Sequence, residues 1–354
     1  MNASVVLRTL GSLAIGGIGG WVFAWLRLPL PWMLGAMATT TAIALAGGGI
    51  VMPRQLRNLL VTVLGVLLGS AFTPEIASQL RTWAAAFAAL AIFAAVATAL
   101  GFFYYRRIGG LDRITAFFAS TPGGLGEMTM VGESMGADAR RVSLCHATRV
   151  LVVVMVIPLY FRFFMGYEPP AGGVAPADAA FAAEDGVVLL ACGLIGWWLG
   201  RKLNMPAAQL LGPMLLSAAA HLAGLTQSRP PSEIVALAQV AIGVSVGARF
   251  AGLDLAAIGR TLAAATGWAA VLLVLTVVAT GLVEATLGTG RAATLLVLAP
   301  GGLAEMTLVA LSLGVDVAFV STMHLLRIAL VVFLAPMIFK LLGWKPEAPA
   351  DDAK

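Results

Sequence analysis

The sequence predicts an all-α polytopic membrane protein with two inverted repeats, each made of about five transmembrane helices and one broken or re-entrant element. Three observations predict this fold class: the composition, a motif that occurs twice, and the distribution of basic residues. Of the 354 residues, 60% are hydrophobic and 11% are charged, whereas soluble domains carry about 25% charged residues. Many apolar runs reach the length of about 20 residues that a helix needs to cross a bilayer.

The apolar runs define the elements of the first repeat in chain order. Lipid offers no hydrogen-bond partners to backbone groups, so each run is expected to be helical. The sequence lacks the alternating apolar and polar residues of a membrane β-barrel. The expected spans are 5–25, 32–50, 56–72, 83–105 and 142–164, with an interrupted element at 114–135 before the last of them.

A connection rich in Pro, Gly and Ala, with several acidic residues, follows the sixth segment and is typical of an exposed linker. The pattern of apolar runs then starts again, and GVLLGSAF of the first half returns as GVSVGARF. The expected organisation is a first membrane repeat at 1–165, an extracytoplasmic linker at 166–186, a second membrane repeat at 187–345 and a cytoplasmic tail at 346–354.

The strongest sign of duplication is a long motif that contains Pro-Gly-Gly. TPGGLGEMTMVGESMGADARRVSLCHATR at 121–149 returns as APGGLAEMTLVALSLGVDVAFVSTMHLLR at 299–327. Between Pro122 and Arg149, fifteen of twenty-eight positions are identical in the second copy. Self-similarity of this kind indicates an internal repeat.

The topology depends on whether the interrupted element crosses the membrane. Pro and Gly are poor residues for a helix interior, so a break is expected at Pro-Gly-Gly. If the element dips in and returns, each repeat has an odd number of crossings and the repeats are inverted. With the N-terminus inside, this arrangement places most Lys and Arg residues on the cytoplasmic side. A discontinuous helix that crosses remains the alternative.

The two breaks are candidate parts of a binding site. Unwound backbone inside a membrane is tolerated where it faces protein or a water-filled cavity. The short helix after each break would direct its N-terminal amides at that cavity and could attract an anion. The alternative is a tightly packed kink with no ligand. The break residues are Pro122, Gly123 and Gly124 in the first copy and Pro300, Gly301 and Gly302 in the second.

Glu127 and Glu305 follow the breaks by one helical turn. A carboxylate inside a membrane is costly and indicates a functional site by default. Partial burial would raise its pKa, so that it could carry a proton near neutral pH. The alternative is a role in capping the exposed amides of the short helix.

Four other polar residues of the motif suit structural roles. Thr129 and Thr307 could be hydroxyl ligands for a substrate or Na⁺, although satisfying backbone groups is their more common role. Asp138 and Asp316 precede long apolar helices, which is the normal place for an N-cap.

His146 and Arg149, with their counterparts His324 and Arg327, lie three residues apart on the helix that follows each break. This spacing keeps them on one stripe of the helix. The arginines could bind a substrate carboxylate or form an ion pair with the glutamate of the motif. The histidines could be a proton relay, a donor to the substrate or an interhelical hydrogen bond.

The paired PGGLxEMT…SxGxD…VSxxHxxR segments resemble the membrane protein AbrB family, also described as an AbrB duplication, over nearly the whole chain. This family is distinct from the small soluble DNA-binding regulator of similar name. Some members carry the label of an ammonia monooxygenase or of a regulator of expression. The fold of the family is similar to that of the cation:proton antiporter and anion transporter group, and the resemblance therefore implies secondary transport.

We expect a secondary transporter, namely a proton- or sodium-coupled carrier of a small organic anion that works by alternating access. We expect no enzymatic activity, no cofactor and no metal. The alternatives are a monooxygenase-type metalloenzyme, or a membrane protein that acts indirectly in the regulation of gene expression. The metalloenzyme would need ligands such as His146, His324, Glu127 and Glu305.

The expected partners are a small-molecule or ion substrate and the lipid bilayer, and a homodimer is considered. Nucleic acid is not expected, because the net charge of +5 is spread over helix ends. The expected location is the bacterial inner (cytoplasmic) membrane, with multiple crossings and both termini in the cytoplasm.

Overall fold

The computed structural model describes residues 3–72, 80–168 and 183–344, and its regular elements in these ranges are helices. Six of the helices are long and apolar enough to cross a membrane. This confirms the predicted all-α class and the multi-pass membrane character. Most of the expected linker and the whole expected tail at 346–354 lie outside the described residues.

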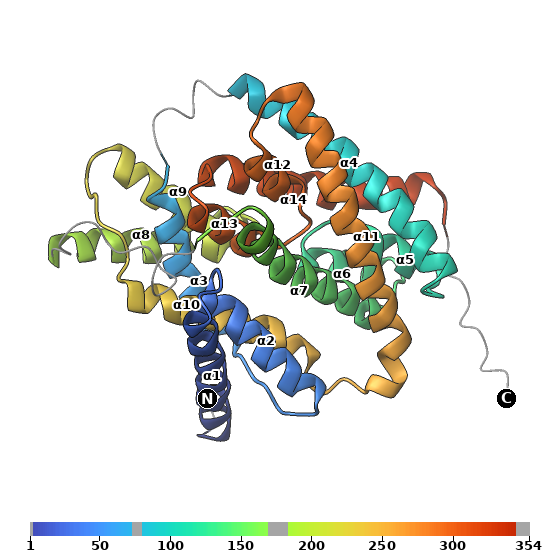
Figure 1. The fold of residues 1–354 in the computed structure, drawn as a ribbon, viewed down its shortest axis with the longest axis horizontal. Coiled ribbons are helices and arrows are strands. Elements are labelled where there is room, and N and C mark those ends of the chain that lie inside the picture. Colours follow the sequence, from blue (N-terminus) through green and yellow to red (C-terminus); the bar gives the residue numbers. More distant parts are fainter. Residues whose placement is uncertain (1–2, 73–79, 169–182, 345–354) are drawn as a thin grey trace. The chain divides into compact units, whose positions relative to one another are not determined.

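Within the described residues, the same order of seven α-helices occurs twice (Figure 1). Corresponding helices have similar lengths, and the short pair that contains the Pro-Gly-Gly break recurs at the same place. The first half consists of α1 (Ala3–Trp25), α2 (Pro31–Leu45), α3 (Arg54–Gly69), α4 (Leu80–Arg107), α5 (Arg113–Ser120), α6 (Leu125–Ser134) and α7 (Ala139–Phe164). The second consists of α8 (Ala183–Lys202), α9 (Ala208–Leu222), α10 (Ser232–Gly247), α11 (Leu255–Leu287), α12 (Arg291–Leu298), α13 (Leu303–Ser312) and α14 (Val317–Leu341).

The helices gather into two compact units, and each unit takes helices from both repeats. Helix α6 belongs to the second unit, whereas its counterpart α13 belongs to the first. The predicted repeats are therefore units of sequence, while the packing units combine both halves of the chain. The first unit comprises Met1–Leu80, Val154–Leu253 and Leu303–Ser321. The second unit comprises Arg81–Val153, Asp254–Gly302 and Thr322–Lys354.

In the first unit, glycines allow the paired helices to touch through their backbones. Gly19 of α1 meets Gly35 of α2, and a Cβ at either position would collide with the backbone oxygen of the other. The second repeat has the same contact between Gly196 of α8 and Gly212 of α9. Small residues at helix contacts are the usual way to bring membrane helices close together.

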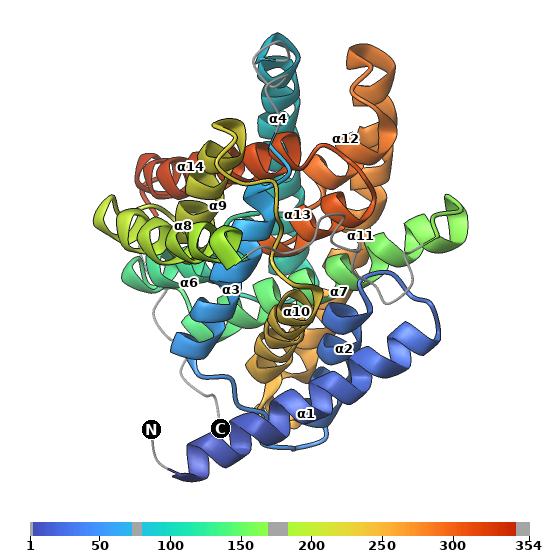
Figure 2. The same cartoon turned by 90° about the vertical axis from the view of Figure 1, so that its left-hand side faces the viewer.

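The two repeats also interlock within the first unit. Helix α3 packs against α9, and α10 packs against α2. Gly65 of α3 lies on the backbone oxygen of Leu210, and Gly243 of α10 lies on that of Met33. Figure 2 shows α10 beside α1 and α2. The third helix of each repeat thus packs against the second helix of the other repeat.

A polar cluster fixes the start of α8 next to the loop that follows α9. The hydroxyls of Thr226 and Ser228 donate to the two carboxylate oxygens of Asp185 at 2.6 and 2.8 Å. These hydrogen bonds lower the pKa of Asp185 below its ordinary value, because they favour the charged carboxylate.

The second unit has a core between α4 and α11, which cross in Figure 1. Gly101 of α4 lets the ring of Trp268 on α11 approach closely, and Tyr105 packs into the same core. Helix α5 has 8 residues and α6 has 10. At 1.5 Å per residue, both are much shorter than a bilayer core of roughly 30 Å.

The first broken element returns to the side from which it starts. The backbone N–H of Asp138, just after α6, donates to Thr115 Oγ1 near the start of α5 at 2.9 Å. Gly132 of α6 also packs on the ring of Phe118 of α5. This geometry agrees with the re-entrant interpretation of the first Pro-Gly-Gly element.

Candidate functional site

The first helix break is formed by Thr121 to Gly124, between α5 and α6. Helix α5 ends at Ser120, and Thr121 and Gly124 have extended backbone conformations. The hydroxyls of Ser120 and Thr121 both donate to Phe117 O, at 2.8 and 2.7 Å. The backbone N–H of Thr121 also donates to Phe117 O, at 3.2 Å. The last residues of α5 and the first of the break thus converge on one carbonyl at the helix end.

Arg149 of α7 binds the backbone of this break. Its Nη2 donates to Gly123 O at 3.1 Å, and its Nη1 makes a longer contact of 3.4 Å with Thr121 O. The side chain is 2% exposed. The arginine therefore holds the two carbonyls on either side of Pro122.

Arg327 of α14 binds the second break in the same way. Its Nη1 donates to Ala299 O at 2.7 Å, and its Nη2 donates to Gly301 O at 2.9 Å. This side chain is also 2% exposed. Within the described residues, neither this guanidinium nor that of Arg149 is paired with a carboxylate.

The arginine contacts differ from the ion pair with the motif glutamate that was one of the two roles considered from the sequence. Backbone carbonyls, and not a glutamate, accept from the terminal nitrogens of Arg149 and Arg327. A buried charge is tolerated when charge-assisted hydrogen bonds compensate for its lost hydration. The Nε–H of both arginines has no hydrogen-bond partner in the described part of the chain. One buried donor thus remains unused in each copy.

The two histidines make matching hydrogen bonds between helices. His146 Nε2 lies 3.0 Å from Phe118 O, and His324 Nε2 lies 2.9 Å from Leu296 O. A carbonyl can only accept, so Nε2 must carry the proton. Arg327 Nη2 lies 3.1 Å from Nδ1 of His324, which must then accept from it. Of the three roles considered for the histidines, these contacts match the interhelical hydrogen bond.

The two glutamates lie in the first turns of their short helices. The half-buried carboxylate of Glu127 folds back over Gly124, the residue that precedes α6. Glu305 is 8% exposed, and its helix α13 packs against α3 within the first unit. A carboxylate in this position interacts favourably with the positive end of the helix dipole.

The threonines and aspartates of the motif form hydrogen bonds with the backbone. Thr129 Oγ1 donates to Leu125 O at 2.8 Å, and Thr307 Oγ1 donates to Leu303 O at 2.6 Å. Asp138 and Asp316 each accept from a backbone N–H three residues later, those of Arg141 and Phe319, at 3.0 and 2.9 Å. The two aspartates are therefore the N-caps of α7 and α14.

Two further arginines of the first unit, Arg57 and Arg249, interact with polar or charged residues of that unit. Arg57 Nε of α3 donates to Ser245 Oγ of α10 at 3.2 Å. Arg249 interacts electrostatically with both Arg57 and Glu305. From the sequence, these arginines contribute only to the excess of cytoplasmic positive charge. The sequence did contain a sign that Arg249 is special. In the repeated motif GVLLGSAF/GVSVGARF, Arg249 of the second copy replaces Ala71 of the first.

Within the described residues, no group of three or more His, Cys, Asp or Glu side chains has the spacing of a metal site.

Comparisons with known proteins cover almost the whole chain. A family model described as "Transition state regulatory protein AbrB" matches residues 32–343. A Bacillus subtilis (strain 168) protein named "Uncharacterized protein YhjN" is 24% identical over 95% of this chain and 94% of its own length. A protein of Escherichia coli (strain K12), named "Putative regulator AbrB", is 23% identical over 91% of this chain and 92% of its own length.

Proposed function

The chain belongs to the AbrB family, and from this premise we propose that it is a secondary transporter. It carries a small organic anion by alternating access, coupled to protons or sodium ions. It lies in the bacterial inner membrane with both termini in the cytoplasm, in accordance with the positive-inside rule. The proposal includes no enzymatic activity, no cofactor and no nucleic-acid partner.

The pair of arginines at the helix breaks is the observation that carries this proposal. Arg149 and Arg327 are buried, bind the carbonyls of equivalent breaks, and each keep one unused Nε–H. A buried donor without a partner costs about 1–3 kcal/mol. An ionised side chain inside a membrane protein indicates a pathway for a substrate or an ion. An anionic substrate could use both the charge and the unused donor.

The helix breaks add a second source of positive potential. Broken helices near the middle of the membrane are a frequent way for secondary transporters to build their sites. The N-terminal amides of α6 lie next to the break that Arg149 binds. Backbone amides at a helix start attract anions, because they carry a partial positive charge.

Glu127 is the proposed coupling residue of the first copy, and Glu305 is that of the second. Each carboxylate lies in the first turn after a break, and Glu127 is half-buried. Proton binding at such a carboxylate would change the local charge by one unit, which gives a physical link between proton uptake and anion binding.

Regulation of gene expression is the second candidate function, and the name of the E. coli relative favours it. In this proposal the effect is indirect and results from the level of a transported metabolite.

The experiment is a current measurement on a solid-supported membrane with proteoliposomes. A panel of carboxylates and amines is applied at two pH values to the wild type and to Glu127→Gln. Glu133→Gln is the matched control, because Glu133 is exposed on the same helix and has no counterpart in the second copy. A carboxylate-evoked current that Glu127→Gln loses and Glu133→Gln keeps supports the proposal. A current evoked by amines alone would refute the anion carrier.

A further inference from the structure

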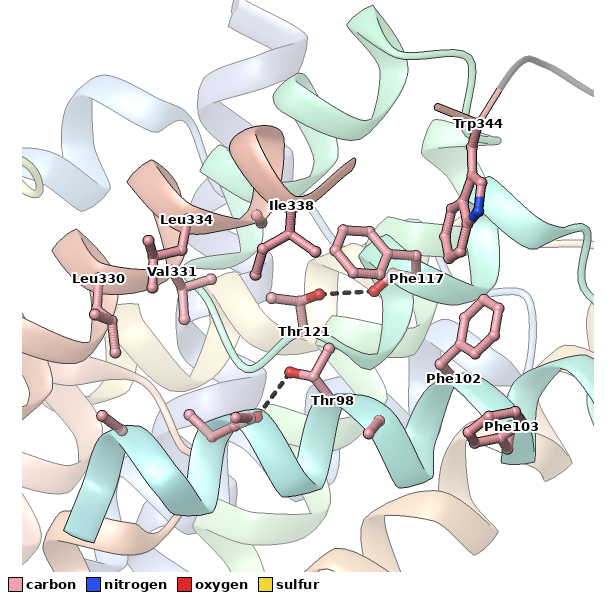
Figure 3. A pocket seen from close by; sticks show the side chains of 15 residues that line it. Thr98, Phe102, Phe103, Phe117, Thr121, Leu330, Val331, Leu334, Ile338 and Trp344 are labelled. Carbon is pink, nitrogen blue, oxygen red and sulfur yellow. Dashed lines mark hydrogen bonds between the residues drawn. The ribbon is translucent and has the colours of Figure 1, made fainter. Parts of the chain in front are cut away.

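The second unit contains an apolar pocket between α4, the end of α5 and the second half of α14 (Figure 3). Its volume is about 360 Å³, within the range of about 300–1,000 Å³ of small-molecule sites. Alanines and phenylalanines of α4 form one wall, and aliphatic side chains of α14 form the other. Trp344 closes one end, where its ring stacks on Phe102 at 5.3 Å between centroids.

Neither hydroxyl in the pocket has a donor left for a polar ligand. Its two threonines both donate to backbone carbonyls of their own helices. Thr98 Oγ1 lies 2.8 Å from Ala94 O, and Thr121 Oγ1 lies 2.7 Å from Phe117 O. Figure 3 shows both bonds. The other lining side chains are alanine, leucine, valine, isoleucine, phenylalanine and tryptophan. A ligand that fits this lining is a hydrocarbon.

The pocket opens on the sides of helices that face lipid. Both α4 and α14 are long and apolar enough to cross a membrane. Two of the lining side chains, Phe103 and Ile338, are 55% and 40% exposed. The exposed side of a membrane-spanning helix is surrounded by acyl chains. Acyl chains are therefore the hydrocarbon that has direct access to the pocket.

Basic residues surround the end that Trp344 closes. The guanidinium carbon of Arg113 lies 5.7 Å from the centre of the Trp344 ring. Arg107 is exposed and lies one turn beyond Phe103 on the same face of α4. Lys340 is in the last turn of α14, just before Trp344. Positive side chains at the end of membrane helices attract anionic head groups at about 1 kcal/mol each.

We propose that this pocket binds one acyl chain of an anionic phospholipid, with the phosphate of the lipid at Arg107, Arg113 and Lys340. The residues 345–354 that follow Trp344 are a poor alternative occupant. Their sequence, KPEAPADDAK, contains several charges and no large apolar side chain. The bound chain would lie against Thr121, so the lipid would contact the edge of the first helix break.

Native mass spectrometry of the delipidated full-length protein tests this proposal with two lipids, phosphatidylglycerol and phosphatidylcholine. We expect the wild type to retain one phosphatidylglycerol in preference to phosphatidylcholine. Ala99→Phe should fill the pocket and remove that bound lipid. Val96→Phe is the matched control, because Val96 is exposed on the same helix but does not line the pocket.

A second variant tests the head-group site without changing the pocket. Arg107→Gln should weaken phosphatidylglycerol binding about fivefold and leave phosphatidylcholine binding unchanged. The proposal is wrong if Ala99→Phe retains phosphatidylglycerol like the wild type, or if both lipids bind equally. Retention of a free fatty acid in place of a phospholipid would also overturn it.

Discussion

The contacts of the two buried arginines predict that Arg327 stabilises the protein more than Arg149 does. The perturbation is a pair of matched substitutions, Arg149→Met and Arg327→Met. Methionine keeps an unbranched side chain of similar shape and removes both the charge and the donors. Both arginines are 2% exposed, so the desolvation energy that each substitution recovers is about the same. That contribution cancels when the two variants are compared.

The magnitude follows from the hydrogen bonds. Arg327 makes two short bonds to carbonyls, at 2.7 and 2.9 Å, and a third to His324 at 3.1 Å. Arg149 makes one bond of 3.1 Å and a contact of 3.4 Å, which is longer than the usual 2.7–3.2 Å. If the long contact of Arg149 is counted as a weak hydrogen bond, Arg327 still makes one more bond from a charged donor, which is worth about 1.5–3 kcal/mol in the free energy of unfolding.

The assay is the apparent melting temperature in detergent at one fixed scan rate, because unfolding of such a protein is generally irreversible. With about 2 °C for each kcal/mol, Arg327→Met should melt about 3–6 °C below Arg149→Met. Circular dichroism at low temperature checks that both variants are folded. A melting temperature of Arg149→Met equal to or below that of Arg327→Met would refute the reasoning.

Three further predictions concern other residues. Glu127→Gln and Glu305→Gln should each reduce the pH dependence of transport in proteoliposomes, and activity like the wild type at every pH would exclude their coupling role. Gly212→Ala should destabilise the protein by about 1–3 kcal/mol, because its Cβ meets a backbone oxygen. Gly11→Ala, where a Cβ meets no other atom, should not, and equal melting temperatures would contradict this. The lowered pKa of Asp185 means that its ionised form stabilises the fold above the unfolded pKa of about 3.9. The melting-temperature loss of Asp185→Asn should therefore shrink as the pH falls below about 4, and a loss independent of pH would contradict it.

The repeated motif made much of the local structure predictable. Pro122 and the two glycines after it cannot continue a helix, and the structure ends α5 just before them. Asp138 and Asp316 precede long apolar runs, and both cap the helices that follow. These features depend on a few neighbouring residues, which is the range over which sequence reasoning is reliable.

The partners of the arginines were not predictable in the same way. A sequence shows which side chains carry charge. It does not show which backbone carbonyls will accept from Arg149 and Arg327, because every residue has a carbonyl. Their availability depends on the extended backbone that each break leaves. Helix α2 is also shorter than the expected span at 32–50. It ends at Leu45, and the rest of the apolar run contains glycines that follow the helix. Hydropathy gives the length of an apolar run, but it does not show where a helix within that run ends.

The packing of helices of one repeat against helices of the other has a consequence for biosynthesis. Ser217 Oγ of α9 donates to Val66 O of α3, two residues that lie 151 positions apart. At about 5–20 residues per second, the ribosome needs roughly 8–30 s to make the chain between them. During that interval the glycine face of α3 has no α9 to pack against. A nascent chain that stops after the first repeat therefore presents an unfinished surface, which stays uncovered until the second repeat arrives.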